Sequence, residues 1–365
     1  MKIQDVITCL EEWAPPVYQE DYDNSGLIVG DRNAEVKGVL VCLDSIEPVV
    51  GEAIAKGCNL IVAHHPILFG GITSLTGSTY VERVLLKAIK NDIAIYAIHT
   101  NLDNVFSGVN NEISNRLGLV NRSILSPKKN CFTKLITFVP SQHAENLRTA
   151  LFKAGGGEIG EYSNCSYNTE GYGTFQSNDK TNPAIGEVGK LNQELETKVE
   201  VLVRNLALKD VLSALFNAHP YEEVAYDLIP LLNSDATIGS GMVGDLDKEM
   251  PVGDFLSRLK DIFNVGALKH TSLENHSRIR RIAVCGGSGS FLLNEAIARN
   301  ADVFISSDFK YHQFFDADGR IVIADIGHYE SEQFTIGLIG RRLTEKFTTF
   351  AVHFTEVNTN PINYL

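Results

Sequence analysis

Short aliphatic runs alternate with helical patterns in two separate parts of this chain, and this alternation limits the folds that it can adopt. In the first part, residues 38–43 form an aliphatic run, a helical pattern ends near Gly57, and a second run covers 59–63. A further helical pattern at 81–90 and the run 93–98 continue the same order. An order of strand, helix and strand predicts a largely parallel sheet covered by helices. We therefore expect an α/β fold.

The second part repeats the first. The run that ends at Cys285 aligns without gaps with the run that ends at Cys42, at an offset of 285 − 42 = 243 residues. The following helix and strand align at the same offset, which places His64-His65 over Ser307-Asp308. The shared order of elements predicts an internal duplication that forms two similar α/β lobes. The alternative is a chance likeness between two ordinary strand-helix-strand units.

A different pattern lies between the two parts, at residues 128–232. It contains two predicted helices and three predicted strands, at 135–139, 144–153, 199–203, 208–217 and 224–231, with a Tyr/Gly/Asn-rich stretch that suits hairpins. This order is typical of the ferredoxin-like α+β arrangement. The 365 residues suffice for two or three domains. We predict an N-terminal lobe at 1–127, an insert at 128–232 and a C-terminal lobe at 233–365.

Charge and cysteine usage exclude several classes of protein. The chain has 32 basic and 45 acidic residues, a net charge of −13, and no basic block that would neutralise nucleic-acid phosphates. Its six cysteines form no C-x-x-C pair, so we expect reduced thiols. Asp5 comes too early for a signal peptide, and no apolar run approaches the ~18 residues of a membrane span. We expect a cytoplasmic protein that contacts no membrane and is not a dedicated nucleic-acid binder.

Metal-ligating residue types follow the predicted strands. His64 and His65 come directly after one strand, Asp103 comes shortly after the next, and His328 and Glu332 follow a strand of the second lobe. In open parallel sheets, ligands bind beyond the carboxyl ends of the strands. Imidazole nitrogen and carboxylate oxygen together suit zinc, iron or manganese. These positions therefore predict a metal site.

The spacing of the five residues bears on the number of ions. In a regular strand His64 and His65 would point to opposite faces, so Pro66 is expected to end the strand there. His328 and Glu332 are four residues apart and would share one face of a helix. Five ligands are too many for one tetrahedral ion, whereas two ions that share a carboxylate and a bridging water would use all of them.

Other roles for these residues remain open from the sequence. Asp103 could cap a helix that begins near Val105, and Glu332 could be a first-turn acid that complements a helix dipole. The Gly-rich run 286–290 could bind an anion with its backbone N–H groups or could be a tight turn between a strand and a helix. Five other histidines are expected to have a structural role: His99, His143, His270, His276 and His353. The roles of His219 and His312 are left open.

Five segments in this order resemble the Nif-three-like proteins, also named GTP cyclohydrolase I type 2 homologues. The segments are Tyr22–Gly30, Ala63–Pro66, Thr100–Asp103 with Gly108–Asn110, Ser307–His312 and Gly327–Glu332. Two departures affect the expected pocket shape more than the metal ligands. Tyr22 stands where many relatives carry tryptophan, and Ser306-Ser307-Asp308 stands where Thr/Ser-Gly-Asp is usual.

The resemblance implies a dinuclear metal centre between two lobes. The matching ligand positions are His64, His65, Asp103, His328 and Glu332. Glu330 is a nearby competitor, and Glu332 is preferred because the family motif places its glutamate four residues after the histidine. Through residues 219–227 the insert resembles the PII-like or CutA-like domain of longer bacterial members. The resemblance also implies a homo-oligomer, a toroidal hexamer.

These observations predict a metal-dependent hydrolase with two divalent ions per chain, zinc first and iron or manganese as alternatives. The ions would lower the pKa of a bridging water and direct the resulting hydroxide at an electrophilic carbon or phosphorus. The family name suggests a small-molecule substrate, a nucleotide or another phosphate-containing compound. Asp308 and His312 are candidates for orienting ligands or transferring protons. The alternative is a regulatory or metal-handling scaffold whose insert senses a small molecule.

Overall fold

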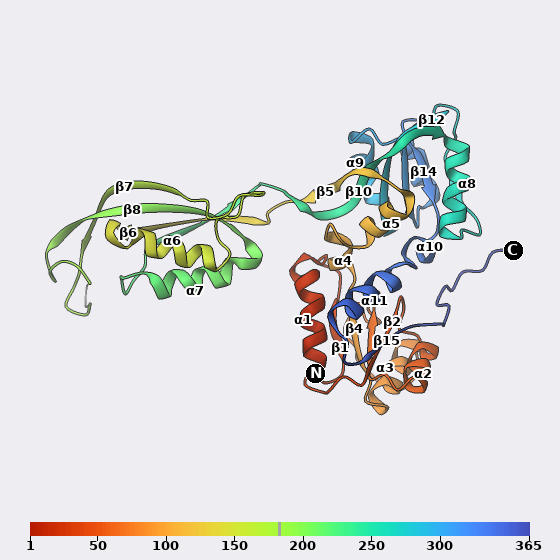
Figure 1. Cartoon of the computed structure of the whole chain (residues 1–365), viewed down its shortest axis with the longest axis horizontal. Helices are drawn as coiled ribbons and strands as arrows, with labels where there is room; N and C mark the ends of the chain where they lie inside the picture. Colours follow the sequence, from red (N-terminus) through yellow and green to blue (C-terminus); the bar gives the residue numbers. More distant parts are fainter. Residues whose placement is uncertain (182–183) are drawn as a thin grey trace. The chain divides into compact units, whose positions relative to one another are not determined.

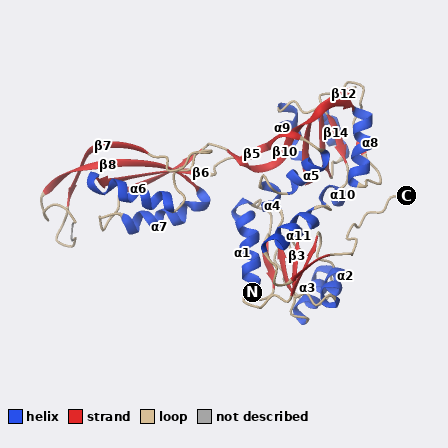
Figure 2. Ribbon diagram, in the orientation of Figure 1, coloured by secondary structure: helices blue, strands red, loops and turns tan. Residues whose placement is uncertain are grey.

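The computed structural model describes residues 1–181 and 184–365, which form two compact units (Figure 1). The main unit comprises Met1–Pro127 and Ala236–Leu365, and the second unit comprises Lys128–Asp235. The described residues contain three sheets together with helices, so the predicted mixed α/β fold is confirmed (Figure 2).

The first sheet of the main unit has the strand order β1-β4-β3-β2-β15. β2, β3, β4 and β15 run parallel, and β1 is an antiparallel edge strand. Every residue of the three central strands is buried because helices cover both faces of the sheet. The strands are β1 (Gly26–Val29), β2 (Gly38–Cys42), β3 (Leu60–Ala63), β4 (Ala94–Ala97) and β15 (Ala351–Phe354).

The second sheet of the main unit has the order β11-β14-β13-β12-β10-β5. β12, β13 and β14 run parallel, while β10 and β11 pair antiparallel with their neighbours. The strands are β5 (Val120–Lys128), β10 (Asp235–Pro251), β11 (Lys269–His270), β12 (Arg278–Ser288), β13 (Val303–Ser307) and β14 (Val322–Asp325). Each sheet contains one strand from the other half of the chain. The N-terminal strand β5 lies next to β10 in the second sheet, and the C-terminal strand β15 pairs with β2 in the first.

The helices of the main unit form amphipathic layers on these sheets. α1 buries Ile3, Val6 and Leu10 in a core cluster that includes residues of both sheets, while α2 and α3 cover the opposite face of the first sheet. The helices are α1 (Ile3–Trp13), α2 (Glu47–Ala55), α3 (Tyr80–Lys90), α4 (Thr100–Asn104), α5 (Val109–Leu117), α8 (Val252–Phe263), α9 (Leu293–Ala298), α10 (His328–Glu332) and α11 (Thr335–Lys346).

Two helices lie on one face of an antiparallel sheet in the second unit. The sheet order is β7-β8-β6-β9, and the chain order is β6, α6, β7, β8, α7, β9. Leu147 of α6 and Leu215 of α7 pack on alternate residues of β8, such as Val201. The elements are β6 (Phe132–Pro140), α6 (Ala144–Lys153), β7 (Tyr167–Gln176), β8 (Leu191–Arg204), α7 (Leu208–Ala218) and β9 (Tyr226–Leu231).

Within residues 1–181 and 184–365, none of the helices combines the length and the apolar character that a bilayer crossing requires.

The turn between α4 and α5 leaves no room for a side chain at Gly108. A Cβ atom there would lie 1.7 Å from the Leu102 carbonyl oxygen and 3.0 Å from the Val105 carbonyl oxygen. Both contacts are with backbone, which cannot move aside as a flexible side chain could. This turn directly follows Asp103, so the close approach also sets the position of a predicted metal ligand.

We expect Gly108→Ala to lower the free energy of unfolding by roughly 1–3 kcal/mol or more, because the added methyl group forces the α4–α5 turn apart. Urea unfolding followed by circular dichroism measures the change. The matched control is Gly253→Ala in α8, where the described residues leave nothing within 4 Å of the new Cβ, and where alanine should stabilise by about 0.5–1 kcal/mol. Equal midpoints for Gly108→Ala and the unmodified protein would contradict the analysis.

Candidate metal centre

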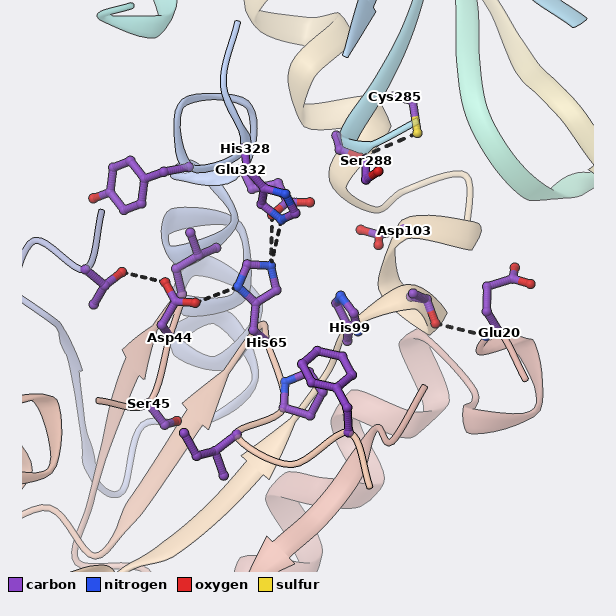
Figure 3. A pocket seen from close by; sticks show the side chains of 18 of the residues that line it. Glu20, Asp44, Ser45, His65, His99, Asp103, Cys285, Ser288, His328 and Glu332 are labelled. Atoms are coloured by element: carbon purple, nitrogen blue, oxygen red, sulfur yellow. Dashed lines mark hydrogen bonds and ion pairs between the residues drawn. The ribbon is translucent and has the colours of Figure 1, made fainter. Parts of the chain in front are cut away.

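Side chains at the strand ends of both sheets line one cavity of about 590 Å³ in the main unit (Figure 3). From the first sheet, Asp44 follows β2, His65 follows β3 and His99 follows β4. From the second sheet, His328 and Glu332 of α10 follow β14. The parallel strands therefore deliver their carboxyl-end residues to a common space, as expected for open sheets of this kind.

The carboxylate of Glu332 lies at the centre of these side chains. Its Oε2 atom is 2.9 Å from Nε2 of His65 and 3.0 Å from Nε2 of His328, and the two nitrogens are 3.4 Å apart. Its Oε1 atom is 3.9 Å from Nε2 of His64. Ligand atoms that share one zinc ion at about 2.0–2.2 Å lie roughly 3–4 Å from one another. The spacing around both oxygens is compatible with shared ions.

His64 directs its buried Nε2 atom at carboxylate oxygens. Its Nδ1 lies 2.9 Å from the carbonyl oxygen of Ile98, which can only accept, so Nδ1 donates there and Nε2 is the nitrogen that faces the carboxylates. Nε2 is 3.6 Å from Oδ1 of Asp103, and within the described residues neither atom has a hydrogen-bond partner. A buried polar atom without a partner costs about 1–3 kcal/mol. A cation between these atoms would remove that cost, so the residues fit a metal ion.

The structure brings all five predicted ligands together in two overlapping groups. One group is His65, His328 and Glu332; the other is His64, Asp103 and Glu332; within each, the ligand atoms lie within 4.8 Å of one another. Glu330 instead accepts a hydrogen bond from Nδ2 of Asn360 and belongs to neither group. The cap position of α5 is occupied by Gly108 and has no side-chain hydrogen bond, so Asp103 does not cap that helix.

Each of four histidines is held through its Nδ1 atom by an acceptor. Besides His64, His65 lies 2.8 Å from Asp44 Oδ1, His328 lies 2.6 Å from Asp308 Oδ2 and His99 lies 2.7 Å from Asp23 Oδ1. An acceptor at Nδ1 sets the ring orientation and leaves Nε2 for a metal or a substrate. The predicted residue Asp308 thus contacts a predicted ligand.

Sequence reasoning did not single out Asp23 or Asp44, and it assigned His99 to the structural histidines. The structure places His99 on the cavity wall, in a group with His64 and His65. Asp44 lies two residues after the end of β2, so the strand-end rule that selected the other residues could have found it. Asp23 lies in a loop that follows no strand, and its place in the motif segment Tyr22–Gly30 was the available signal.

The two histidines that the sequence left open lie elsewhere. His312 is exposed beside Tyr311 and Phe315, and it is not among the described residues that line the cavity. His219 is buried in the second unit, where both ring nitrogens have backbone partners at Phe138 and Tyr221. The structure therefore places neither ring at the centre.

The ionisable groups of the centre strongly shift one another's pKa values. Burial, with the nearby Glu332 carboxylate, raises the pKa of Asp103 to about 7. Burial also opposes ionisation of Glu332, but the charge of His328 and imidazole hydrogen bonds outweigh it and hold the pKa of Glu332 well below its usual range. The Glu332 charge raises the pKa of His328 to about 11. The carboxylates therefore attract whatever positive charge is present, a proton or a metal ion.

A glycine at the end of β12 makes room for the central carboxylate. Gly287 has φ +60°, and a Cβ atom there would lie 2.4 Å from Oε1 of Glu332. The hydroxyl groups of Ser306 and Ser307 donate to the Gly287 carbonyl oxygen at 2.9 Å and 2.6 Å. The Gly-rich run therefore positions Glu332.

The same run does not offer its backbone to an anion. The N–H groups of Gly286, Gly287 and Gly289 donate to side-chain oxygens of Asn110, Ser331 and Ser306, each at 2.9 Å. The following helix, α9, begins only at Leu293. Of the two roles left open by the sequence, the structure favours the tight turn.

Comparison with known proteins identifies the family of the chain. Residues 1–361 match the family Duf34/NIF3 (NGG1p interacting factor 3). A protein of Halalkalibacterium halodurans named GTP cyclohydrolase 1 type 2 homolog is 38% identical over 369 residues, covering 99% of this chain and 98% of the relative. The Bacillus subtilis protein of the same name is 36% identical over 368 residues, with 99% and 98% covered.

A solved structure of a Bacillus cereus protein related to NIF3 superposes with a TM-score of 0.83 at 35% identity, covering 100% of this chain and 99% of that one. The sequence and the fold therefore agree with the resemblance drawn from the five motif segments. The chain belongs to the Duf34/NIF3 family.

Proposed function

We propose that this protein is a metal-dependent hydrolase with two divalent ions per chain. The observation that carries the proposal is the buried Nε2 of His64, which faces the carboxylates of Asp103 and Glu332 without a hydrogen-bond partner among the described residues. The relatives named GTP cyclohydrolase 1 type 2 homolog support a hydrolytic reaction.

The ligand groups suggest how the ions would be shared. One ion would bind His65, His328 and Oε2 of Glu332, and the other would bind His64, Asp103 and Oε1 of Glu332. Mixed imidazole and carboxylate ligands suit zinc, with iron and manganese as alternatives. Bound ions of this kind activate water and polarise the group that it attacks.

The remaining side chains of the centre orient groups and hold protons. Asp44 and Asp308 hold His65 and His328 through Nδ1, so that each Nε2 is directed at Glu332. His99, held by Asp23, lines the cavity and has Nε2 available to exchange a proton with a substrate there. Asp308 therefore acts as a positioning residue, while His99 is the candidate for general acid–base work.

The strand orders of the three sheets support the predicted duplication and the predicted insert. The order of β2, β3 and β4 in one sheet matches that of β12, β13 and β14 in the other, which supports a duplication that produced two lobes at 1–127 and 233–365. In the second unit, the chain order and the sheet order β7-β8-β6-β9 support a ferredoxin-like insert at 128–232.

A non-catalytic scaffold is the second candidate function. It is favoured by the second unit, because none of the described residues that line the cavity belongs to Lys128–Asp235. A domain that adds nothing to the cavity could instead sense a small molecule or a partner. The toroidal homohexamer implied by the resemblance stays a prediction, which light scattering coupled to size-exclusion chromatography would test.

Metal analysis tests the centre itself. We expect about two ions per chain in protein loaded with Zn²⁺, about one in His64→Ala and in His328→Ala, and substantially less than one in Glu332→Ala, because Glu332 contributes an oxygen to both groups. Inductively coupled plasma mass spectrometry measures the content. His270→Ala, which alters an exposed histidine, should retain two. Fewer than one ion per chain in the unmodified protein would refute the centre.

Asp308→Asn tests the positioning role of Asp308. Weakening the acceptor at Nδ1 of His328 should lower metal affinity or turnover by roughly 10- to 100-fold, with the fold retained. The measurements are competitive chelator titration and hydrolysis of GTP, simple phosphoesters and cyclic amides under Zn²⁺, Mn²⁺ and Fe²⁺. Asp316→Asn, on the exposed 3-10 helix Tyr311–Ala317, is the matched control. If His64→Ala and His328→Ala retained full turnover under every metal, the enzyme proposal would fail.

A further inference from the structure

The cavity over the centre is rich in acidic side chains, whereas the described residues that line it include no basic side chain of the lysine or arginine type. Among the described residues that line it, four are carboxylates and none is lysine or arginine; the carboxylates are Glu20, Asp44, Asp103 and Glu332. Recognition of phosphate groups normally uses arginine or lysine. The four positive charges of two divalent ions would be balanced by these four carboxylates, which leaves no excess positive charge for a polyanion.

The backbone does not replace the missing cations. Three N–H groups of the run 286–289 already donate to side-chain oxygens, so they are not available to a phosphate. Among the described residues, neither a lysine or arginine of the cavity wall nor these three glycine N–H groups can therefore hold a phosphate chain. A phosphate group could then bind only by direct contact with the metal ions.

Aromatic side chains supply the other main feature of the cavity. Four of them, which we call the aromatic rim, line the cavity and yet stay more than half exposed: Tyr22 (68%), Phe69 (59%), Tyr80 (58%) and Phe291 (64%). They come from three separate parts of the sequence, since Phe69 and Tyr80 are only 11 residues apart. Exposed aromatic rings gathered at a cavity mark a ligand surface more often than isolated exposed ones do.

One member of the rim connects this surface with the centre. The ring of Phe69 lies 5.8 Å from the ring of His99, edge to face, and His99 lies 5.3 Å from His65 in the same kind of contact. In Figure 3, His65, His99, Asp103 and Glu332 surround one space. A planar ring in this space could stack on the rim while its edge reaches the metal ligands.

We propose that the substrate of this centre is an uncharged planar ring compound, held by the aromatic rim, and that phosphate groups add nothing to its recognition. This inference rests on the proposed function and names the substrate class of the same site. For a nucleotide, the proposal means that the cavity recognises the ring and does not recognise the triphosphate.

Ligand binding to the zinc-loaded full-length protein tests the inference. Two series of ligands are used, guanosine, GMP and GTP, and uridine, UMP and UTP; within each series the ring is the same and only the number of phosphates changes. Saturation-transfer NMR with competition gives the affinities. We expect at least one nucleoside to bind, and we expect no gain in affinity when phosphates are added. Phe69→Ala should weaken nucleoside binding about tenfold, since stacking of a base on an aromatic side chain contributes on this scale. Phe69→Trp should retain binding.

The control is Phe315→Ala, which removes an equally exposed phenylalanine that does not line the cavity. It should leave every affinity unchanged. The inference is overturned if neither nucleoside binds, if GTP binds at least tenfold more tightly than guanosine, or if Phe69→Ala has no effect. A change of oligomeric mass in Phe69→Ala would also overturn it, because the rim would then serve as a contact between copies of the chain.

Failure of this inference and failure of the proposed function give different results. Ring binding that depends on Phe69, without metal-dependent turnover of any compound, would retain the inference and overturn the hydrolase. Metal-dependent turnover of GTP or phosphoesters that is indifferent to Phe69→Ala would retain the hydrolase and overturn the inference.

Discussion

The buried carboxylate of Glu332 is the group on which the arrangement of the centre depends. One of its oxygens lies against His65 and His328, and the other faces His64. A buried charge of this kind requires compensating positive charge. The neighbouring structure provides for its position: Gly287 leaves the space that Oε1 occupies, and Gly327, with φ +90°, turns the chain from β14 into α10.

The interlocked sheets keep both sides of this contact in place. His64 and His65 follow a strand of the first sheet, whereas His328 and Glu332 follow a strand of the second. Because β15 returns to the first sheet and β5 pairs in the second, the halves of the chain are joined by backbone hydrogen bonds as well as by side-chain packing. Histidines anchored at Nδ1 add local rigidity, so the Nε2 atoms are already oriented before an ion or a substrate binds.

The rule that ligands follow the ends of parallel strands identified the predicted metal ligands but not the residues that hold or accompany them. It selected His64, His65, Asp103, His328 and Glu332, because metal-ligating residue types after successive strands form a local pattern. It did not select Asp23, Asp44 or His99. The contacts that reveal these three join residues separated by 21 or more positions, such as Asp23 with His99 and Asp44 with His65. The strand-end rule extends to Asp44 after β2, but the pairing of Asp44 with His65 and of Asp23 with His99 depends on the fold.

The sequence by itself determined the α/β class, the alternation of strands and helices, and the family, because periodicity and motif order are local properties of the chain. Only the tertiary structure decided which sheet receives β5 and β15, which nitrogen of each imidazole faces the cavity, and that the Gly-rich run supports Glu332 rather than an anion. Strand pairing between distant segments and the direction of a ring depend on contacts that form when the chain folds. The lack of lysine and arginine around the centre is likewise visible only once those segments meet.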